Sequence, residues 1–159
     1  MTTTTETLQV YRVYIKATPQ AIWDAITKPE WTEKYGYQSP VEYDLRPGGA
    51  YRGYASKAMI TMGVPEVAVE GEVIEVDPPR KLVQTWHALW EPLEEVTRLT
   101  YEITEAEGGV TALTVTHELD GAPNLAAMVG GHVEGAGGGW GELLSDLKTL
   151  LETGKGLYG

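Results

Sequence analysis

Apolar and polar residues alternate with a period of two along most of the chain, which is the pattern of half-buried β-strands. Residues 8–15, rich in β-branched and aromatic types, predict the first strand. Six further strands are predicted over residues 41–45, 50–56, 66–77, 82–90, 96–106 and 110–119. Turn sequences such as RPGG and EGG separate neighbouring segments, so we expect an antiparallel arrangement. The apolar phase slips around Gly71, which predicts a bulge there.

Other segments repeat with the helical period of about 3.6 residues. Thr-Pro and Lys-Pro pairs predict two short helices over residues 18–27 and 28–35, and the second places Trp31 and Tyr35 on one face. Residues 57–65 are irregular and predict a loop, whereas residues 125–133 predict a short helix. Residues 139–153 carry a full apolar stripe that ends at Gly154, and they predict the longest helix.

This order of elements predicts an α+β fold with a single sheet. We expect a curved antiparallel sheet of about six to seven strands, with two short helices and the long C-terminal helix on its concave side. Such an arrangement either fills with side chains or encloses a cavity. A chain of 159 residues fits one domain, which we place at residues 8–159 after a disordered polar tail at residues 1–7.

Composition narrows the classes of function. The formal net charge is −11 and no basic patch is visible, so we expect binding to neither nucleic acid nor an anionic membrane. Cysteine is absent, which excludes disulfides and thiolate chemistry. The start of the chain has no signal-peptide pattern, and no apolar run is long enough for a membrane span. We therefore expect a cytoplasmic protein, either a monomer or a homodimer.

Five sequence motifs resemble those of a known superfamily. They are ATPQAIWDAIT, YDLRPGGAYR, GEVIEVDPPRKLVQTW, VTHELDG and GGWGELLSDLKTLLE. Together they resemble the START-like, helix-grip superfamily (SRPBCC), and most of all its branch similar to the C-terminal domain of heat-shock-protein ATPase activators (AHSA-type). The chain departs from that branch at residues 35–37, where Tyr-Gly-Tyr stands in place of a pair of tryptophans.

The resemblance implies a deep cavity between the curved sheet and the last helix, often holding lipids, polyketides or other apolar molecules. Relatives in the superfamily include cyclases, carriers, co-chaperone domains and resistance proteins. The acidic, glycine-rich chain is also similar to the small self-sacrifice resistance proteins of enediyne producers. In those relatives a reactive diradical is quenched on the backbone of the protein itself.

Large aromatic and methionine side chains are the candidates for a ligand-binding cavity, because Trp and Tyr combine an apolar ring with a polar tip. The alternative for each is a place in a filled core. The predicted ligand-binding residues are Trp31, Tyr35, Tyr54, Met62, Trp86, Trp90, Tyr101, His117, Met128, Trp140 and Leu144.

Candidates for catalysis are few. His117 shares a strand face with apolar residues, so it is either a general acid or base or a core histidine bonded to a backbone carbonyl. His87 has the opposite phase and is expected to face outward, and His132 lies in a glycine-rich tract. No metal-binding spacing and no nucleophile motif is present, so we expect neither a metal nor another cofactor.

A glycine-rich tract precedes the C-terminal helix, and three interpretations of it remain open. It is a plain structural joint, a hinge that lets the helix move, or a set of hydrogen donors for radical chemistry. Its members are Gly130, Gly131, Gly135, Gly137, Gly138 and Gly139.

These observations favour a non-enzymatic protein that binds an apolar or amphipathic small molecule under the C-terminal helix. Three alternatives stay open. The first is self-resistance by sequestration or sacrificial cleavage, the second is a polyketide cyclase-like enzyme that uses His117, and the third is a co-chaperone-like protein partner.

Overall fold

Seven strands form one antiparallel sheet in the order β1-β7-β6-β5-β4-β3-β2. The computed structural model describes residues 7–159, so the predicted disordered tail falls, apart from Thr7, outside the described residues. The strands are β1 (Leu8–Ile15), β2 (Val41–Tyr43), β3 (Ala50–Tyr54), β4 (Val67–Asp77), β5 (Lys81–Ala88), β6 (Thr97–Glu105) and β7 (Thr111–Glu118). The first and last strands of the chain therefore pair side by side, and β2 forms the opposite edge.

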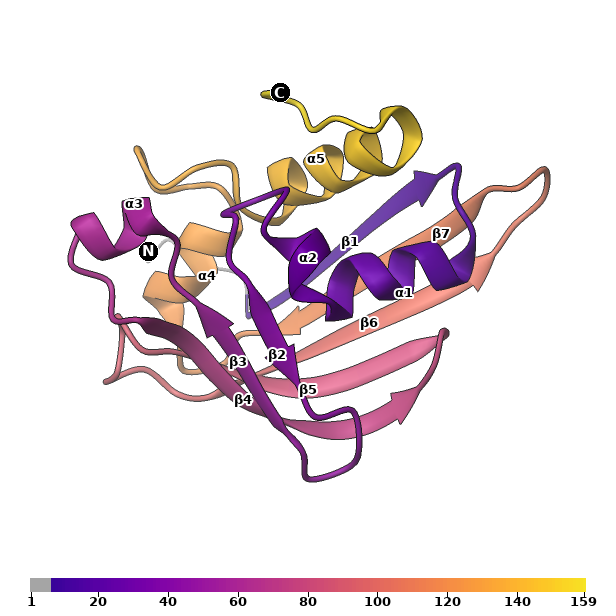
Figure 1. Ribbon diagram of the computed structural model, residues 1–159. Helices are drawn as coiled ribbons and strands as arrows, with labels where there is room; N and C mark the ends of the chain where they lie inside the picture. The colour runs from indigo at the N-terminus through magenta and orange to yellow at the C-terminus, as the bar shows by residue number, and fades with distance from the viewer. Residues whose placement is uncertain (1–6) are drawn as a thin grey trace, which may run out of the picture.

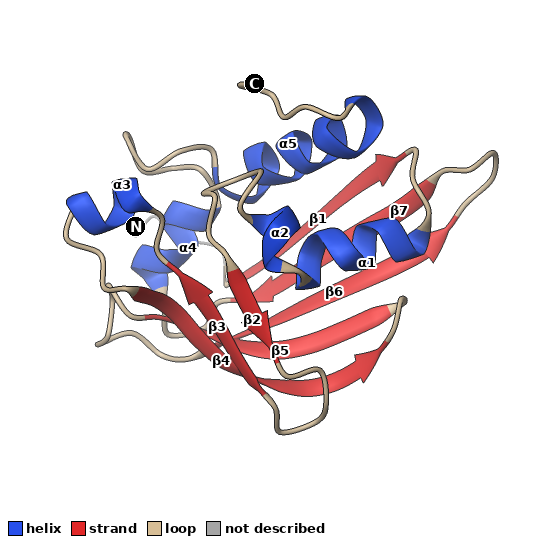
Figure 2. Cartoon of the chain, viewed as in Figure 1, coloured by secondary structure: helices blue, strands red, loops and turns tan. Residues whose placement is uncertain are grey.

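All helices of the described chain lie on the concave side of the sheet (Figures 1 and 2). They are α1 (Pro19–Thr27), α2 (Pro29–Thr32), α3 (Lys57–Thr61), α4 (Pro123–Val129) and α5 (Gly139–Thr153). The Thr18 hydroxyl accepts a hydrogen bond from the amide of Ala21 and caps α1, as the Thr-Pro pair predicts. Gly154 ends α5 with φ of 86°. The predicted helix-grip arrangement is confirmed.

The structure corrects four local predictions. Residues 57–61 form the short helix α3 instead of a loop, because the Ser56 hydroxyl accepts from the amide of Met59 and starts a helical turn. The second helix ends at Thr32, three residues before Tyr35, and β5 ends at Ala88, so Trp90 follows the strand. The register shift expected at Gly71 lies farther along β4, between residues 73 and 75.

A close approach explains the glycine at position 71. A Cβ there would overlap the carbonyl oxygen of Thr85 on β5, so only glycine lets the two strands pair at this point. The amide of Glu72 donates to the Thr85 hydroxyl at 2.8 Å, which replaces a regular ladder bond at the same place.

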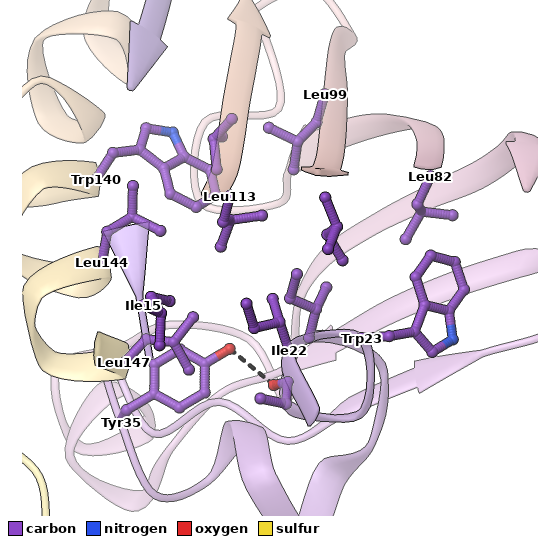
Figure 3. Close-up of a cluster of buried hydrophobic side chains, with 14 of the residues drawn as sticks. Ile15, Ile22, Trp23, Tyr35, Leu82, Leu99, Leu113, Trp140, Leu144 and Leu147 are labelled. Atoms are coloured by element: carbon purple, nitrogen blue, oxygen red, sulfur yellow. Dashed lines mark hydrogen bonds between the residues drawn. The ribbon is translucent and has the colours of Figure 1, made fainter. Parts of the chain in front are cut away.

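The packed core fills one end of the concave side. Alternate residues of β5, β6 and β7, including Leu82, Leu99 and Leu113, are fully buried against α1 and the inner face of α5. Figure 3 shows this cluster, with Trp140 and Leu144 projecting from α5 toward the sheet. Toward α4, a second and smaller cluster of buried residues packs separately, and it includes Leu119 and Leu125.

A candidate ligand cavity

A cavity of about 670 Å³ lies between the concave face of the sheet and the N-terminal half of α5. Its walls are the ends of α1, α2 and α4, helix α3, the 35–39 loop, the inner faces of β2 to β7 and the glycine-rich tract. The exposed residues Met62, Gly135 and Gly137 belong to the lining and mark its mouth, between α3 and the glycine-rich tract. The lining is predominantly apolar, and among the described residues it includes no Asp, Glu, Lys, Arg or His.

Helix α5 provides the roof. Trp140, Leu143, Leu144 and Leu147, at the i, i+3, i+4 and i+7 positions, point from one face of the helix into the cavity. The first residue of α5, Gly139, has φ of 65°, and a Cβ there would overlap the carbonyl oxygen of Val129. The start of α5 is therefore held tightly against the end of α4.

A buried carboxylate fixes the loop that faces this roof. Asp146 of α5 accepts hydrogen bonds of 2.8 Å from the amide of Gly36 and from the amide of Leu157. The same loop is held from the other side, because the Tyr35 hydroxyl donates to the carbonyl of Ala25 at 2.8 Å, the dashed line in Figure 3. The 35–37 departure from the AHSA-type pattern thus forms an ordered part of the cavity wall.

Five aromatic rings form a continuous arc beside the cavity, and all of them except His117 line it. They are Trp90, Trp86, His117, Trp140 and Tyr101, and the centroids of successive rings are 6.0, 5.5, 6.0 and 6.2 Å apart. Each ring meets the next nearly edge to face, at interplanar angles between 76° and 86°. Such contacts are favourable beyond simple burial, so the arc is a preorganised wall.

His117 is the middle ring of this aromatic arc and is fully buried. Its Nδ1 accepts from the Trp140 indole N–H at 3.2 Å, so the ring proton sits on Nε2 and is donated to the Thr97 hydroxyl, 2.9 Å away. The Thr97 hydroxyl donates in turn to the carbonyl of Trp86 at 2.7 Å. Burial lowers the pKa of His117 to about 3, so the ring is neutral at physiological pH.

The cavity also holds a group of four tyrosines. The Tyr35 hydroxyl donates to Ala25, and the Tyr43 hydroxyl donates to Gln84 Oε1 at 2.5 Å. Burial raises the pKa of Tyr35, Tyr43, Tyr51 and Tyr101 above the ordinary value for tyrosine, and each of these groups except Tyr51 is raised further by other tyrosines in the set. All four hydroxyls are therefore neutral, and the lining carries no formal charge.

Eight of the predicted ligand-binding residues line this cavity. They are Tyr35, Met62, Trp86, Trp90, Tyr101, Met128, Trp140 and Leu144. Three do not: His117 lies behind the lining, and Trp31 and Tyr54 face elsewhere. Tyr54 shares the outer face of β3 with Arg52, and its hydroxyl donates to Glu42 at 3.1 Å. Trp31 lies under the ammonium group of Lys34, 4.8 Å from the ring centroid.

Half of the predicted glycines in the glycine-rich tract also line the cavity. Gly135, Gly137 and Gly139 line the cavity, whereas Gly130, Gly131 and Gly138 do not. Across the mouth, the Tyr37 hydroxyl donates to the carbonyl of Ala136 at 3.0 Å and joins the tract to the 35–39 loop.

Several lining residues were missing from the sequence-based prediction. Tyr43 and Tyr51 face each other across the β2–β3 hairpin, with ring centroids 4.7 Å apart, and the alternation of those strands already placed them on an inward face. Leu143 and Leu147 belonged to the apolar stripe of the last helix, which gave no means of separating cavity lining from core. Met59 comes from α3, which the sequence did not predict.

The opposite face of the sheet has a smaller depression of about 290 Å³, lined by His87, Thr85 and Arg52 among others. His87 thus lies on the outer phase of β5, as predicted. Within residues 7–159, no three His, Cys, Asp or Glu side chains are grouped as a metal site would require. None of the helices in the same range is long and apolar enough to cross a membrane.

Comparison with known families identifies the fold independently. Residues 16–152 match the family described as Activator of Hsp90 ATPase homolog 1-like protein, AHSA1. The chain belongs to the AHSA1 family. Comparison with curated protein sequences found no match.

Solved structures of similar fold come from several settings. CalU16 from Micromonospora echinospora is 22% identical with a TM-score of 0.58, over 81% of this AHSA1 chain and 70% of its own. The Aha1 dimer from Colwellia psychrerythraea is 18% identical with a TM-score of 0.67, over 94% and 98% of the two chains. DynU16, from the dynemicin biosynthetic locus, is 20% identical with a TM-score of 0.68 over 95% of this chain. This chain spans 49% of the DynU16 chain. At these identities the likeness establishes the fold alone.

Proposed function

We propose that this AHSA1 protein binds an apolar or amphipathic small molecule, such as a lipid or polyketide, in the cavity under α5. The observation that carries the proposal is the cavity itself, whose volume of about 670 Å³ lies within the usual range for small-molecule sites. Its mostly apolar walls favour release of water to an apolar ligand. Its few polar groups, chiefly tyrosine and tryptophan tips, are suited to orienting a ligand.

The proposal is tested with N-phenyl-1-naphthylamine, an uncharged probe that fluoresces in apolar surroundings. Leu144→Trp adds volume at the roof of the cavity, and Ser145→Trp, one residue along on the solvent side of α5, is the matched control. We expect wild type and Ser145→Trp to bind equally, and Leu144→Trp to bind at least about tenfold more weakly, because the probe loses the space.

Circular dichroism establishes that the variants fold. Ala58→Trp, at an exposed lining position on α3, tests the same space where Leu144→Trp does not fold. Probe binding that none of these folded variants changes would place the probe elsewhere and remove the support for a cavity ligand.

A second candidate function is self-resistance to a reactive enediyne-type antibiotic. The observation that favours it is the position of Gly135 and Gly137, which are exposed and line the mouth of the cavity. A diradical held there takes a hydrogen atom from a glycine Cα, which leaves a radical stabilised by both flanking amides and trapped by dioxygen. The likeness in fold to DynU16, from the dynemicin biosynthetic locus, adds context.

Incubation with a thiol-activated enediyne tests this candidate by mass spectrometry of the chain. Sacrifice predicts cleavage within residues 135–139 that Gly135→Ala and Gly137→Ala redirect or reduce. An intact chain that still protects DNA from the drug indicates sequestration. An intact chain with no protection rejects the candidate.

The family description favours a third candidate, binding to an Hsp90-type chaperone. A pull-down with purified Hsp90, followed by measurement of its ATPase rate, separates this candidate from the other two. A cyclase-like role for His117 gains no support from the geometry, because both ring nitrogens are engaged and the ring lies behind the cavity lining.

A further inference from the structure

The two ends of the aromatic arc each carry a hydrogen-bond donor without a partner. At one end, the hydroxyl of Tyr101 makes no hydrogen bond to any described residue, although the side chain lies mid-strand on the concave face. At the other end, the indole N–H of Trp90 is buried and likewise unpaired within residues 7–159. Buried donors are almost always satisfied in folded proteins, so the covered Trp90 N–H is unusual, and the Tyr101 hydroxyl is an accessible unpaired donor on the same cavity wall.

Three neighbouring polar side chains already have hydrogen-bond partners. The Tyr35 and Tyr43 hydroxyls donate to Ala25 and Gln84, as described above. The ring nitrogens of His117 are engaged by Trp140 and Thr97. The Tyr101 hydroxyl therefore differs from those of Tyr35 and Tyr43, and it is partly exposed to the cavity.

The absence of charged side chains from the described lining indicates the charge of the ligand. The lining contains no acidic, basic or histidine side chain among the described residues. An ionised ligand would lose its hydration without gaining a counter-ion, which is strongly unfavourable. An uncharged ligand with a hydrogen-bond acceptor loses little hydration and gains a bond from the free donor.

We propose that the ligand of this cavity is an uncharged aromatic molecule with a carbonyl oxygen, and that Tyr101 donates a hydrogen bond to that oxygen. This inference rests on the proposed function and specifies its ligand class. The buried Trp90 N–H, at the other end of the arc, is a secondary donor for a ligand long enough to follow the arc. Tyr101 thus acts as a specificity-determining residue.

Three probes with one ring skeleton test the inference by equilibrium dialysis. They are 9-fluorenone, with a carbonyl; fluorene, without one; and 9-fluorenone-2-carboxylate, with an added charge. Fluorene is the more hydrophobic of the neutral pair, so a cavity without a free donor prefers it. We expect wild type to prefer fluorenone by about fivefold, as one hydrogen bond provides. The carboxylate should bind at least about tenfold more weakly than fluorenone.

Tyr101→Phe keeps the ring and removes the hydroxyl. We expect it to reverse the preference, so that fluorene binds more tightly, while the affinity for fluorene itself stays within about twofold of wild type. Tyr14→Phe is the matched control, because the exposed Tyr14 side chain does not line the cavity, and it should keep the preference for fluorenone.

The outcomes separate the inference from the proposed function. Equal binding of fluorenone and fluorene by wild type, or an unchanged preference in Tyr101→Phe, overturns the role of Tyr101 while leaving a cavity that binds apolar molecules. Tight binding of the carboxylate overturns the uncharged ligand class. Failure of both neutral probes to bind overturns the proposed function and the inference together.

Discussion

Trp140 and His117 are joined by a hydrogen bond of 3.2 Å from the indole N–H to Nδ1, which ties the first turn of α5 to the end of β7. The bond fixes the protonation state of the histidine and the orientation of the tryptophan at once. Trp140 lines the cavity and His117 does not. His117 therefore holds the Trp140 ring in place from behind the lining. The orientation of a lining residue on α5 therefore depends on a residue outside the lining.

Stability should fall on acidification because of His117. Its pKa lies near 6.5 in the unfolded chain and at about 3 in the folded protein, so below pH 6.5 the unfolded state takes up a proton that the native state does not. The contribution of His117 to the free energy of unfolding is complete above pH 6.5 and decreases as the pH falls toward 3. Urea unfolding should show a loss of about 2 kcal/mol at pH 5 relative to pH 7.

His117→Gln is the control for this pH dependence, since Gln does not titrate and its amide oxygen can still accept from Trp140. We expect the variant to be less stable at pH 7 and to lose less stability between pH 7 and pH 5. Equal slopes for variant and wild type would assign the acid sensitivity to other groups.

Replacing a leucine with alanine should lower the free energy of unfolding less at the cavity than in the packed core. Leu99 is fully buried among core side chains, and Leu99→Ala should lower the free energy of unfolding by about 3–4 kcal/mol. Leu144 faces the cavity, so fewer contacts are lost, and Leu144→Ala should cost about 1–2 kcal/mol. Denaturant unfolding measures both, and equal losses would mean that the cavity is closed in solution.

Glycines of the last segment should respond in opposite directions. Gly139→Ala combines a left-handed backbone with a clash against Val129, so we expect a loss of at least about 3 kcal/mol or no folded protein. Gly141, two residues later, is helical with open space around its Cα, and Gly141→Ala should stabilise by about 0.5–1 kcal/mol. Thermal unfolding measures the pair. A tolerated Gly139→Ala would show that the start of α5 is a loose hinge.

The bond across the cavity mouth should control ligand exchange. Tyr37→Phe removes the hydrogen bond to Ala136, so we expect N-phenyl-1-naphthylamine to dissociate about fivefold faster in stopped-flow measurements. Tyr158→Phe is the control, because it removes a hydrogen bond to Glu142 among residues that do not line the cavity. Stability should change by less than about 0.5 kcal/mol in both variants. Identical dissociation rates would mean that the ligand leaves by another route.

Local patterns were sufficient for most elements. The boundaries of the first strand and of the last helix agree with the structure, because a run of β-branched and aromatic residues and a long apolar stripe are strong local signals. The one-turn helix α3 was missed, since five residues are too few to show a period. Tyr54 was expected in the lining because of its residue type, whereas the alternation along β3 places it on the outer face with Arg52, opposite to Tyr51.

The sequence by itself determined the order of elements, the inward face of most strands and the covering role of the C-terminal helix, because each depends on residues close together in the chain. Only the tertiary structure decided that the space under α5 is partly hollow, since its volume depends on residues from five helices, six strands and the loops between them. It also decided that His117 supports Trp140 and that Tyr101 keeps a free hydroxyl. Those contacts join residues distant in sequence, and no local period encodes which polar atoms meet when the chain packs.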